Sequence, residues 1–270
     1  MGDATLQLVL YFGRLLLLTL GTVLVCGLAV RACANAFSRL LGGGADRVFD
    51  VTAIIGTPIH ELGHALMCPL FCHKIRKMRL WSPTAQGGVY GFVEHSYSKK
   101  NAWARLGNLF IGIGPIFSGL GIVVLTLWLC FPDAWADYLI TTRGFAVTGG
   151  DVQDLLGGMV QLLCAVLGSA SNVLWRTLLG IVIILSVALH ISLSWADIKG
   201  SLNALPLYLL LVAAFAVVST ALGVDARILT SLRLFHLRLL SLFCVDIAFA
   251  AVWVGIALLY RMCRIAKSWF

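Results

Sequence analysis

Charged residues are scarce in this sequence. Only 12% of its 270 residues are Asp, Glu, Lys or Arg, whereas 60% are hydrophobic and the mean hydropathy is +0.95. A soluble domain of this length carries about a quarter charged residues, and no soluble core of this size could bury so much apolar surface. The scarcity of charge therefore excludes a soluble globular protein and indicates a multi-pass membrane protein, in which lipid covers the apolar surface.

The sequence also lacks paired cysteines, internal repeats and Pro/Ser-rich linkers. Its eight cysteines include no CxxC pair, and most lie in apolar stretches, where cysteine behaves as a small hydrophobic residue. This excludes a disulfide framework and a cysteine metal site. We expect one integral membrane domain over residues 1–270. Its first apolar stretch lacks the basic start and cleavage site of a signal peptide, so we expect a retained span.

Six apolar stretches have about the 20 residues that a membrane helix needs. They are 6–30, 49–71, 106–131, 172–196, 205–224 and 239–260. We therefore expect an all-α multi-pass membrane protein with about six transmembrane helices. A further apolar segment, 151–168, begins with the possible N-cap Asp151 and fits an interfacial, re-entrant or spanning helix.

The loops carry the information on orientation. The connection 72–105 has seven Lys and Arg against one acid, Glu94, and the C-terminal tail is also basic. The connection 132–171 is mainly acidic. Because Lys and Arg concentrate in cytoplasmic loops, we expect the basic side to face the cytoplasm, with the protein in the cell (inner) membrane. The net charge of +8 then reflects loops facing anionic lipid, and we expect no nucleic-acid partner.

Within the basic loop, the segment 78–97 predicts a β-hairpin. Strand-like runs flank a Gly-Gly turn signal at positions 87–88. The expected fold is thus an all-helical membrane domain with a small β-hairpin in the cytoplasmic loop after the second span.

The second span contains a His-Glu-Leu-Gly-His motif at positions 60–64. Residues i and i+4 lie on one helix face, so His60 and His64 can direct imidazole nitrogens at one metal ion. Glu61 lies about 100° round the helix from His60, so it can reach a water on that ion without being a ligand. Because ionisable groups at membrane depth are costly unless they are paired, the motif predicts a metal site.

A catalytic zinc ion takes three protein ligands and a water, so the two histidines need a partner. Met67 and Leu70 stand where the extended metzincin motif has its glycine and third histidine, which excludes that class. Asp197, at the inner end of the fourth span, comes level with His64 after a modest tilt of its helix. We therefore expect Asp197 to be the third ligand.

A polar stripe supports this choice. Ser186, His190, Ser194 and Asp197 follow one another at helical steps on an otherwise apolar helix, so the stripe should face the protein interior. The alternative is a hydrogen-bonding seam between helices. We expect His190 to assist the metal site or the transition state, or else to be the third ligand in place of Asp197.

The third span contains a stripe of small or polar residues at helical steps, Asn108, Gly112, Pro115 and Gly119. Small residues let helix backbones approach closely, and proline loosens the helix. The stripe predicts close helix packing or a groove beside the metal. Gly63 in the second span also allows another element to come close.

Three of these elements, in this order, resemble the site-2 protease family of intramembrane zinc metalloproteases. They are the motif 60–64 within a span, Gly114-Pro115 in the next span, and the segment Asp197 to Gly200 at a later span end. The chain lacks the Asn-Pro that the family usually has before an Asp-Gly pair, and His190 stands roughly where that asparagine would be. The resemblance is therefore to a divergent member.

The resemblance implies an enzyme that cleaves peptide bonds of membrane-protein substrates near the cytoplasmic side. It implies zinc as the cofactor, with His60, His64 and Asp197 as ligands and Glu61 as the general base. His190 or Asn108 is then placed to stabilise the oxyanion.

A substrate helix must unwind before it is cleaved, and an edge of the hairpin 78–97 can pair with the unwound segment as an added strand. The alternative is a plain cytoplasmic loop at the lipid headgroups.

Two other functions fit the same residues. One is a membrane metallohydrolase that acts on a lipid or small amphiphile with the same zinc and Glu61. The other is a non-catalytic metal-binding, transport or regulatory protein. In a transporter the functional residue would be Asp246 in the sixth span, unless it pairs with a polar group of a neighbouring span.

Overall fold

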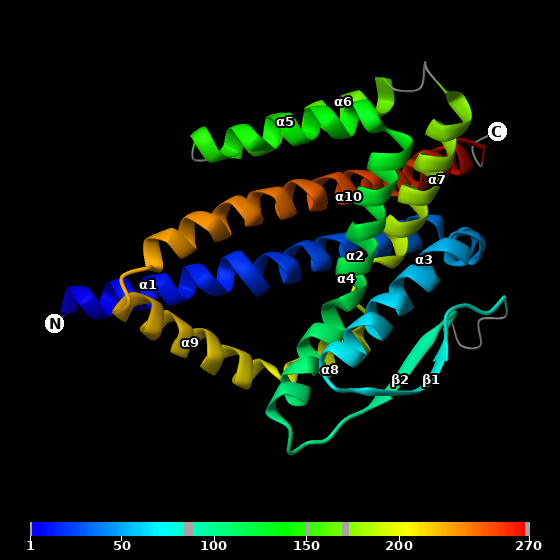
Figure 1. Cartoon of the computed structure of the whole chain (residues 1–270). Coiled ribbons are helices and arrows are strands. Elements are labelled where there is room, and N and C mark those ends of the chain that lie inside the picture. Colours follow the sequence, from blue (N-terminus) through cyan, green and yellow to red (C-terminus); the bar gives the residue numbers. More distant parts are fainter. Residues whose placement is uncertain (1, 84–88, 149–151, 169–172, 268–270) are drawn as a thin grey trace.

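The computed structural model describes residues 2–83, 89–148, 152–168 and 173–267, most of which are helical (Figure 1). The elements, in chain order, are α1 (Gly2–Leu16), the π-helical turn η1 (Leu17–Gly21), α2 (Thr22–Leu41), α3 (Gly44–Leu70), β1 (Lys74–Arg79), β2 (Phe92–Ser96), α4 (Ala102–Cys130), α5 (Pro132–Thr148), α6 (Val152–Gly168), α7 (Leu174–His190), α8 (Trp195–Leu202), α9 (Leu205–Ala221) and α10 (Asp225–Lys267).

Three helices of the described chain are long and apolar enough to cross a membrane: Gly2–Leu41, Ala102–Cys130 and Asp225–Ala266. Helices α7 and α8, bent by 57° at a short break, make a fourth if they are counted as one broken span. These helices indicate a membrane protein.

The six expected spans are therefore confirmed only in part, for two physical reasons. The stretch 205–224 forms α9, whose 17 residues are fewer than a span requires. The stretch 49–71 lies in α3, which has the length of a span, but its two histidines and Glu61 lower its hydropathy. The stretch 6–30 belongs to a longer helix that continues to Leu41.

The helices form a bundle in which α2 and α10 run side by side, and α3, α4 and α7 pack against one another (Figure 1). The core between them consists of large apolar side chains that are almost fully buried. They include Val30 of α2, Ile116, Val123 and Leu127 of α4, Ile184 of α7 and Phe243 of α10. Helices α5 and α6 pack against each other and lie alongside α10, at the top of the view in Figure 1.

The predicted β-hairpin is present. β1 and β2 pair antiparallel from Lys74↔Ser96 to Arg79↔Phe92, with an irregularity between Ile75 and Lys77. The Gly-Gly turn signal at 87–88 lies outside the described residues. The predicted helix 151–168 is α6, which begins at Val152; its proposed cap at position 151 also lies outside the described residues.

Glycine allows α3 and α4 to touch through their backbones. A Cβ added at Gly63 would lie 2.6 Å from the carbonyl carbon and oxygen of Gly114 and 2.5 Å from Ser118 Oγ. The Ser118 hydroxyl donates a hydrogen bond of 2.7 Å to the carbonyl of Ile59 on α3. The expectation that Gly63 admits another element is confirmed, and that element is the Gly114-Pro115 segment.

The small stripe of α4 faces the bent pair α7–α8. A Cβ at Gly112 would meet Ser201 Oγ and would lie 2.7 Å from the carbonyl oxygen of Asp197, while a Cβ at Gly119 would meet Ile191. Close packing, one of the two predictions for this stripe, is confirmed at Gly112 and Gly119. The other, a groove, is also found, because Asn108 and Gly112 line the cavity that contains His60, His64 and Asp197. The packing brings α8, with Asp197, against the same helix that contacts α3.

We predict that Gly63→Ala separates α3 from α4 and lowers the stability of the fold by about 1–3 kcal/mol, the usual effect of overpacking. The measurement is thermal unfolding in detergent micelles. Gly121→Ala is the matched control, because its Cβ would meet nothing within 4 Å and alanine is the better helix former by about 1 kcal/mol. Equal melting temperatures for the two variants would contradict the predicted contact.

Candidate metal centre

Backbone carbonyls orient the two histidines of α3. His60 Nδ1 lies 2.7 Å from the carbonyl oxygen of His190, and His64 Nδ1 lies 2.7 Å from the carbonyl oxygen of Ile111. A carbonyl only accepts hydrogen bonds, so each Nδ1 carries the proton and donates it. In the neutral rings both Nε2 atoms are then left with free lone pairs. Metal-binding histidines usually have this arrangement.

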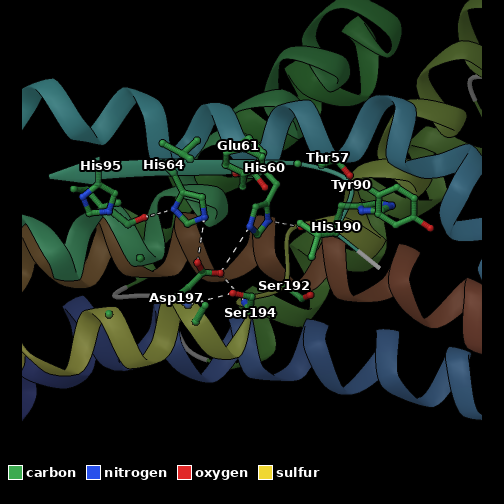
Figure 2. A pocket seen from close by; sticks show the side chains of 18 of the residues that line it. Thr57, His60, Glu61, His64, Tyr90, His95, His190, Ser192, Ser194 and Asp197 are labelled. Carbon is green, nitrogen blue, oxygen red and sulfur yellow. Dashed lines mark hydrogen bonds and ion pairs between the residues drawn. The ribbon is translucent and has the colours of Figure 1, made fainter. Parts of the chain in front are cut away.

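The two imidazoles converge on one carboxylate. Their ring centroids are 5.0 Å apart, and Figure 2 shows both rings directed toward Asp197. Asp197 Oδ1 lies 3.2 Å from His64 Nε2, and Asp197 Oδ2 lies 3.8 Å from His60 Nε2. One donor atom from each residue lies within 4.8 Å of the others, so the group could hold a metal ion. Two imidazole nitrogens and a carboxylate oxygen are a suitable donor set for a divalent ion.

A helix N-terminus holds the Asp197 side chain in place. α7 ends at His190, and α8 begins at Trp195 with Ser194 as its N-cap. The backbone N–H of Asp197 donates to Ser194 Oγ at 3.1 Å, and the backbone N–H of Ser194 donates to Asp197 Oδ2 at 2.7 Å. This reciprocal pair, a capping box, fixes one carboxylate oxygen and leaves the other directed at His64.

The four residues of the polar stripe face the interior, as expected, since Ser186 is buried and the other three line the cavity. The prediction that they lie on one continuous helix is wrong. The capping box starts a new helix at Trp195, and this breaks the periodicity on which the stripe was based. The Ser186 hydroxyl donates to the carbonyl of Val182 in its own helix and is not part of the site. Of the two residues considered for the third ligand, the structure brings the Asp197 side chain to the histidine pair.

The His190 side chain has a different environment. Its Nε2 lies 3.0 Å from Thr52 Oγ1, whose own proton goes to the carbonyl of Val48, so the imidazole donates this bond. The ring packs over Gly56 and edge-on against Phe49, at 5.8 Å between ring centroids. His190 therefore contributes to the site mainly through its backbone carbonyl.

Asn108 and Glu61 both line the cavity that contains the metal-binding group. The Asn108 amide donates to the carbonyl of Arg105 at 3.2 Å, and its second N–H has no acceptor within the described residues. Glu61 is only 7% exposed and lies under Gly91, where an added Cβ would be 2.8 Å from Glu61 Cγ. Within the described residues, the Glu61 carboxylate has no hydrogen bond or salt bridge.

The cavity has a volume of about 750 Å³ and lies between α3, the hairpin, α4 and the α7–α8 break. Its hairpin wall is formed by residues 89–93 and His95. The Tyr90 hydroxyl donates a 2.7 Å hydrogen bond to Asp50 Oδ1 and so attaches this wall to α3. Burial and the bond to Asp50 raise the pKa of Tyr90 to about 12, which keeps the phenol protonated.

Asp246 is separate from this site. Its side chain is fully buried in α10, and neither carboxylate oxygen has a hydrogen-bond partner in the described part of the chain. The expected pairing with a polar group of a neighbouring span is therefore wrong. Asp246 is also not among the residues that line the cavity.

Some contacts of the site could not be predicted from the sequence. The carbonyl of Ile111, which orients His64, is a backbone group that every residue has, so no residue type indicates it. Ser194 did have a signal, because Ser-x-x-Asp at 194–197 is a capping pattern.

Comparison of the chain with protein-family models, curated proteins and solved structures finds no match.

We predict that His60→Ala and Asp197→Ala reduce the bound metal to about a tenth of the wild-type content or less. Substitution of residues that only hydrogen-bond to a metal ligand already lowers metal affinity by about 10–100-fold, and loss of a ligand should lower it at least as much. Elemental analysis of the purified proteins measures this. His190→Ala is the control, because its ring donates to Thr52 and its backbone carbonyl remains. Full metal content in Asp197→Ala, with loss in His190→Ala, would reassign the third ligand to His190.

Proposed function

We propose that this chain is an intramembrane zinc metalloprotease, a divergent member of the site-2 protease family, which hydrolyses peptide bonds of membrane-embedded substrates. The observation that carries the proposal is the convergence of His60 Nε2, His64 Nε2 and the Asp197 carboxylate in one cavity beside an unpaired glutamate. The order of the three sequence elements along the chain agrees with the family pattern.

The donor set favours zinc. Imidazole and carboxylate together suit Zn²⁺, and a catalytic site with three protein ligands keeps a position for water. When bound, the ion supplies a Lewis acid and lowers the pKa of that water toward roughly 7. Both Nδ1 protons are already held by carbonyls, so the histidines need no change of tautomer to bind it.

Glu61 is the general base in this proposal. It neighbours His60 on α3, lines the same cavity and has no partner in the described structure to neutralise its carboxylate. It takes the proton of the attacking water and passes it to the leaving amine. Asn108 is the better of the two expected oxyanion stabilisers, because its second amide hydrogen is free whereas His190 Nε2 is bound to Thr52.

The wall of the cavity suits an extended peptide. Within the described residues β2 pairs only with β1, so its other edge is free, and residues 89–93 before and within β2 line the cavity. We infer that an unwound substrate segment adds to this edge as a strand. The strand β1 is basic and all six of its residues are exposed, which agrees with a hairpin on the cytoplasmic side of the membrane.

We predict that Glu61→Gln lowers the rate of hydrolysis by about 10²–10⁴-fold, the range for loss of a general acid–base group, and leaves the metal content unchanged. The assay offers membrane-spanning peptides and lipid esters to the detergent-solubilised protein. Glu94→Gln is the matched control, because Glu94 is the other glutamate of the chain and is exposed on β2.

The outcomes separate the alternatives. If the wild-type protein cleaves the lipid ester but not the peptide, the protein is a hydrolase of lipids or small amphiphiles. Full function of Glu61→Gln with full metal content would identify a metal-binding protein without catalysis.

A further inference from the structure

A second pair of histidines lies at the edge of the metal cavity, on the hairpin. His73 Nδ1 and His95 Nδ1 are 2.8 Å apart, and His73 Nε2 lies 2.7 Å from the carbonyl oxygen of Ala104 on α4. His73 is 5% exposed, and its ring stacks on Tyr97 with 4.6 Å between ring centroids. The pair therefore joins β2 to the start of α4.

The hydrogen bonds of this pair have a defined direction. The Ala104 carbonyl only accepts, so His73 Nε2 carries a proton, and in the neutral ring His73 Nδ1 is an acceptor. His95 Nδ1 then donates to it, which leaves His95 Nε2 unprotonated. Burial, with His73 and His64 nearby, lowers the pKa of His95 and favours this neutral form.

The local backbone is shaped to hold His73. Cys72 has a φ of 59°, in the left-handed region that non-glycine residues rarely adopt. This turn directs the chain from the end of α3 to His73. Gly107 of α4 lets this turn approach closely, because an added Cβ would meet Phe71 Cβ and would lie 3.0 Å from His73 Nε2.

His95 faces the cavity. It lines the same space as the metal-binding group, two residues after Val93 and thus on the same face of β2. Figure 2 shows its ring beside that of His64. Its Nδ1 is bound to His73, and its Nε2 has no hydrogen-bond partner within the described residues.

We propose that His95 is a substrate-binding residue whose Nε2 accepts a hydrogen bond from a backbone N–H of the extended peptide in the cavity, and that His73 is a positioning residue that holds His95 in this tautomer. The inference rests on the proposed protease function and names a side-chain contact that the peptide makes in addition to the metal and the backbone edge of β2.

Two substitutions separate this role from a purely structural one. The amide of asparagine occupies about the position of Nδ1 in histidine, and the amide of glutamine about that of Nε2. His95→Asn keeps a donor to His73 but removes the group that faces the cavity. His95→Gln keeps a polar acceptor in the cavity and loses the bond to His73.

The probes are two hydroxamates added to the zinc-loaded protein, one with an extended peptide arm and one, acetohydroxamate, without it. We expect His95→Asn to weaken binding of the peptidyl hydroxamate by about threefold to tenfold, the value of one net hydrogen bond, and to leave acetohydroxamate unchanged. His95→Gln should bind the peptidyl probe nearly as tightly as the wild type.

Three results would overturn the proposal. Binding of the peptidyl hydroxamate could be weaker in His95→Gln but normal in His95→Asn, it could be normal in both variants, or it could be equally weak in both. Failure of acetohydroxamate to bind the wild type would instead reject the zinc site and with it the proposed function. If His95→Asn does not fold, nitrogen NMR of the histidines in the wild type decides. Protonation of His95 Nε2 in the neutral ring would then refute the assigned tautomer.

Discussion

The candidate metal-binding group of His60, His64 and Asp197 depends on two hydrogen bonds from imidazole Nδ1 atoms to backbone carbonyls. The carbonyls of His190 and Ile111 belong to α7 and α4, so each histidine of α3 is oriented by a different neighbouring helix. If either carbonyl moved, the corresponding Nε2 would no longer face Asp197. The orientation of the two imidazole rings therefore depends on the relative positions of α3, α4 and α7. Close contacts between these helices keep the rings in place.

Those contacts use small residues and a helix break. Gly63 and Gly114 allow α3 and α4 to touch, and Gly112 admits the start of α8. The break after His190 turns the chain by 57° and exposes a helix N-terminus, where Ser194 and Asp197 cap each other. A carboxylate deep in an apolar bundle is costly unless it has partners. Asp197 Oδ2 accepts a hydrogen bond from the backbone N–H of Ser194, and the histidine pair lies beside the carboxylate, where a bound cation would be its further partner.

Much of the site was predictable from the sequence because it depends on spacing. The motif at 60–64 places two imidazoles on one face of any helix, and Gly63 and Gly114-Pro115 indicate where backbones meet. The depth of Asp197 at the inner end of its span indicates its position near His64, whereas the helical stripe that supports this choice is interrupted by the capping box after His190. The number of spans was not predictable from hydropathy alone, because an apolar stretch does not show whether its helix continues, as 6–30 does to Leu41.

The hairpin is fastened at two distant points. Tyr90 binds Asp50 on α3, and His73 binds Ala104 on α4. The segment 89–93, which includes Tyr90, lines the cavity, and Gly91 lies over Glu61. Because α3 and α4 also touch at Gly63, the two attachment points of the hairpin belong to helices that pack directly against each other. Any molecule in the cavity would therefore lie between α3 and a hairpin that is held at Asp50 and at Ala104, and both attachments together limit the space open to it.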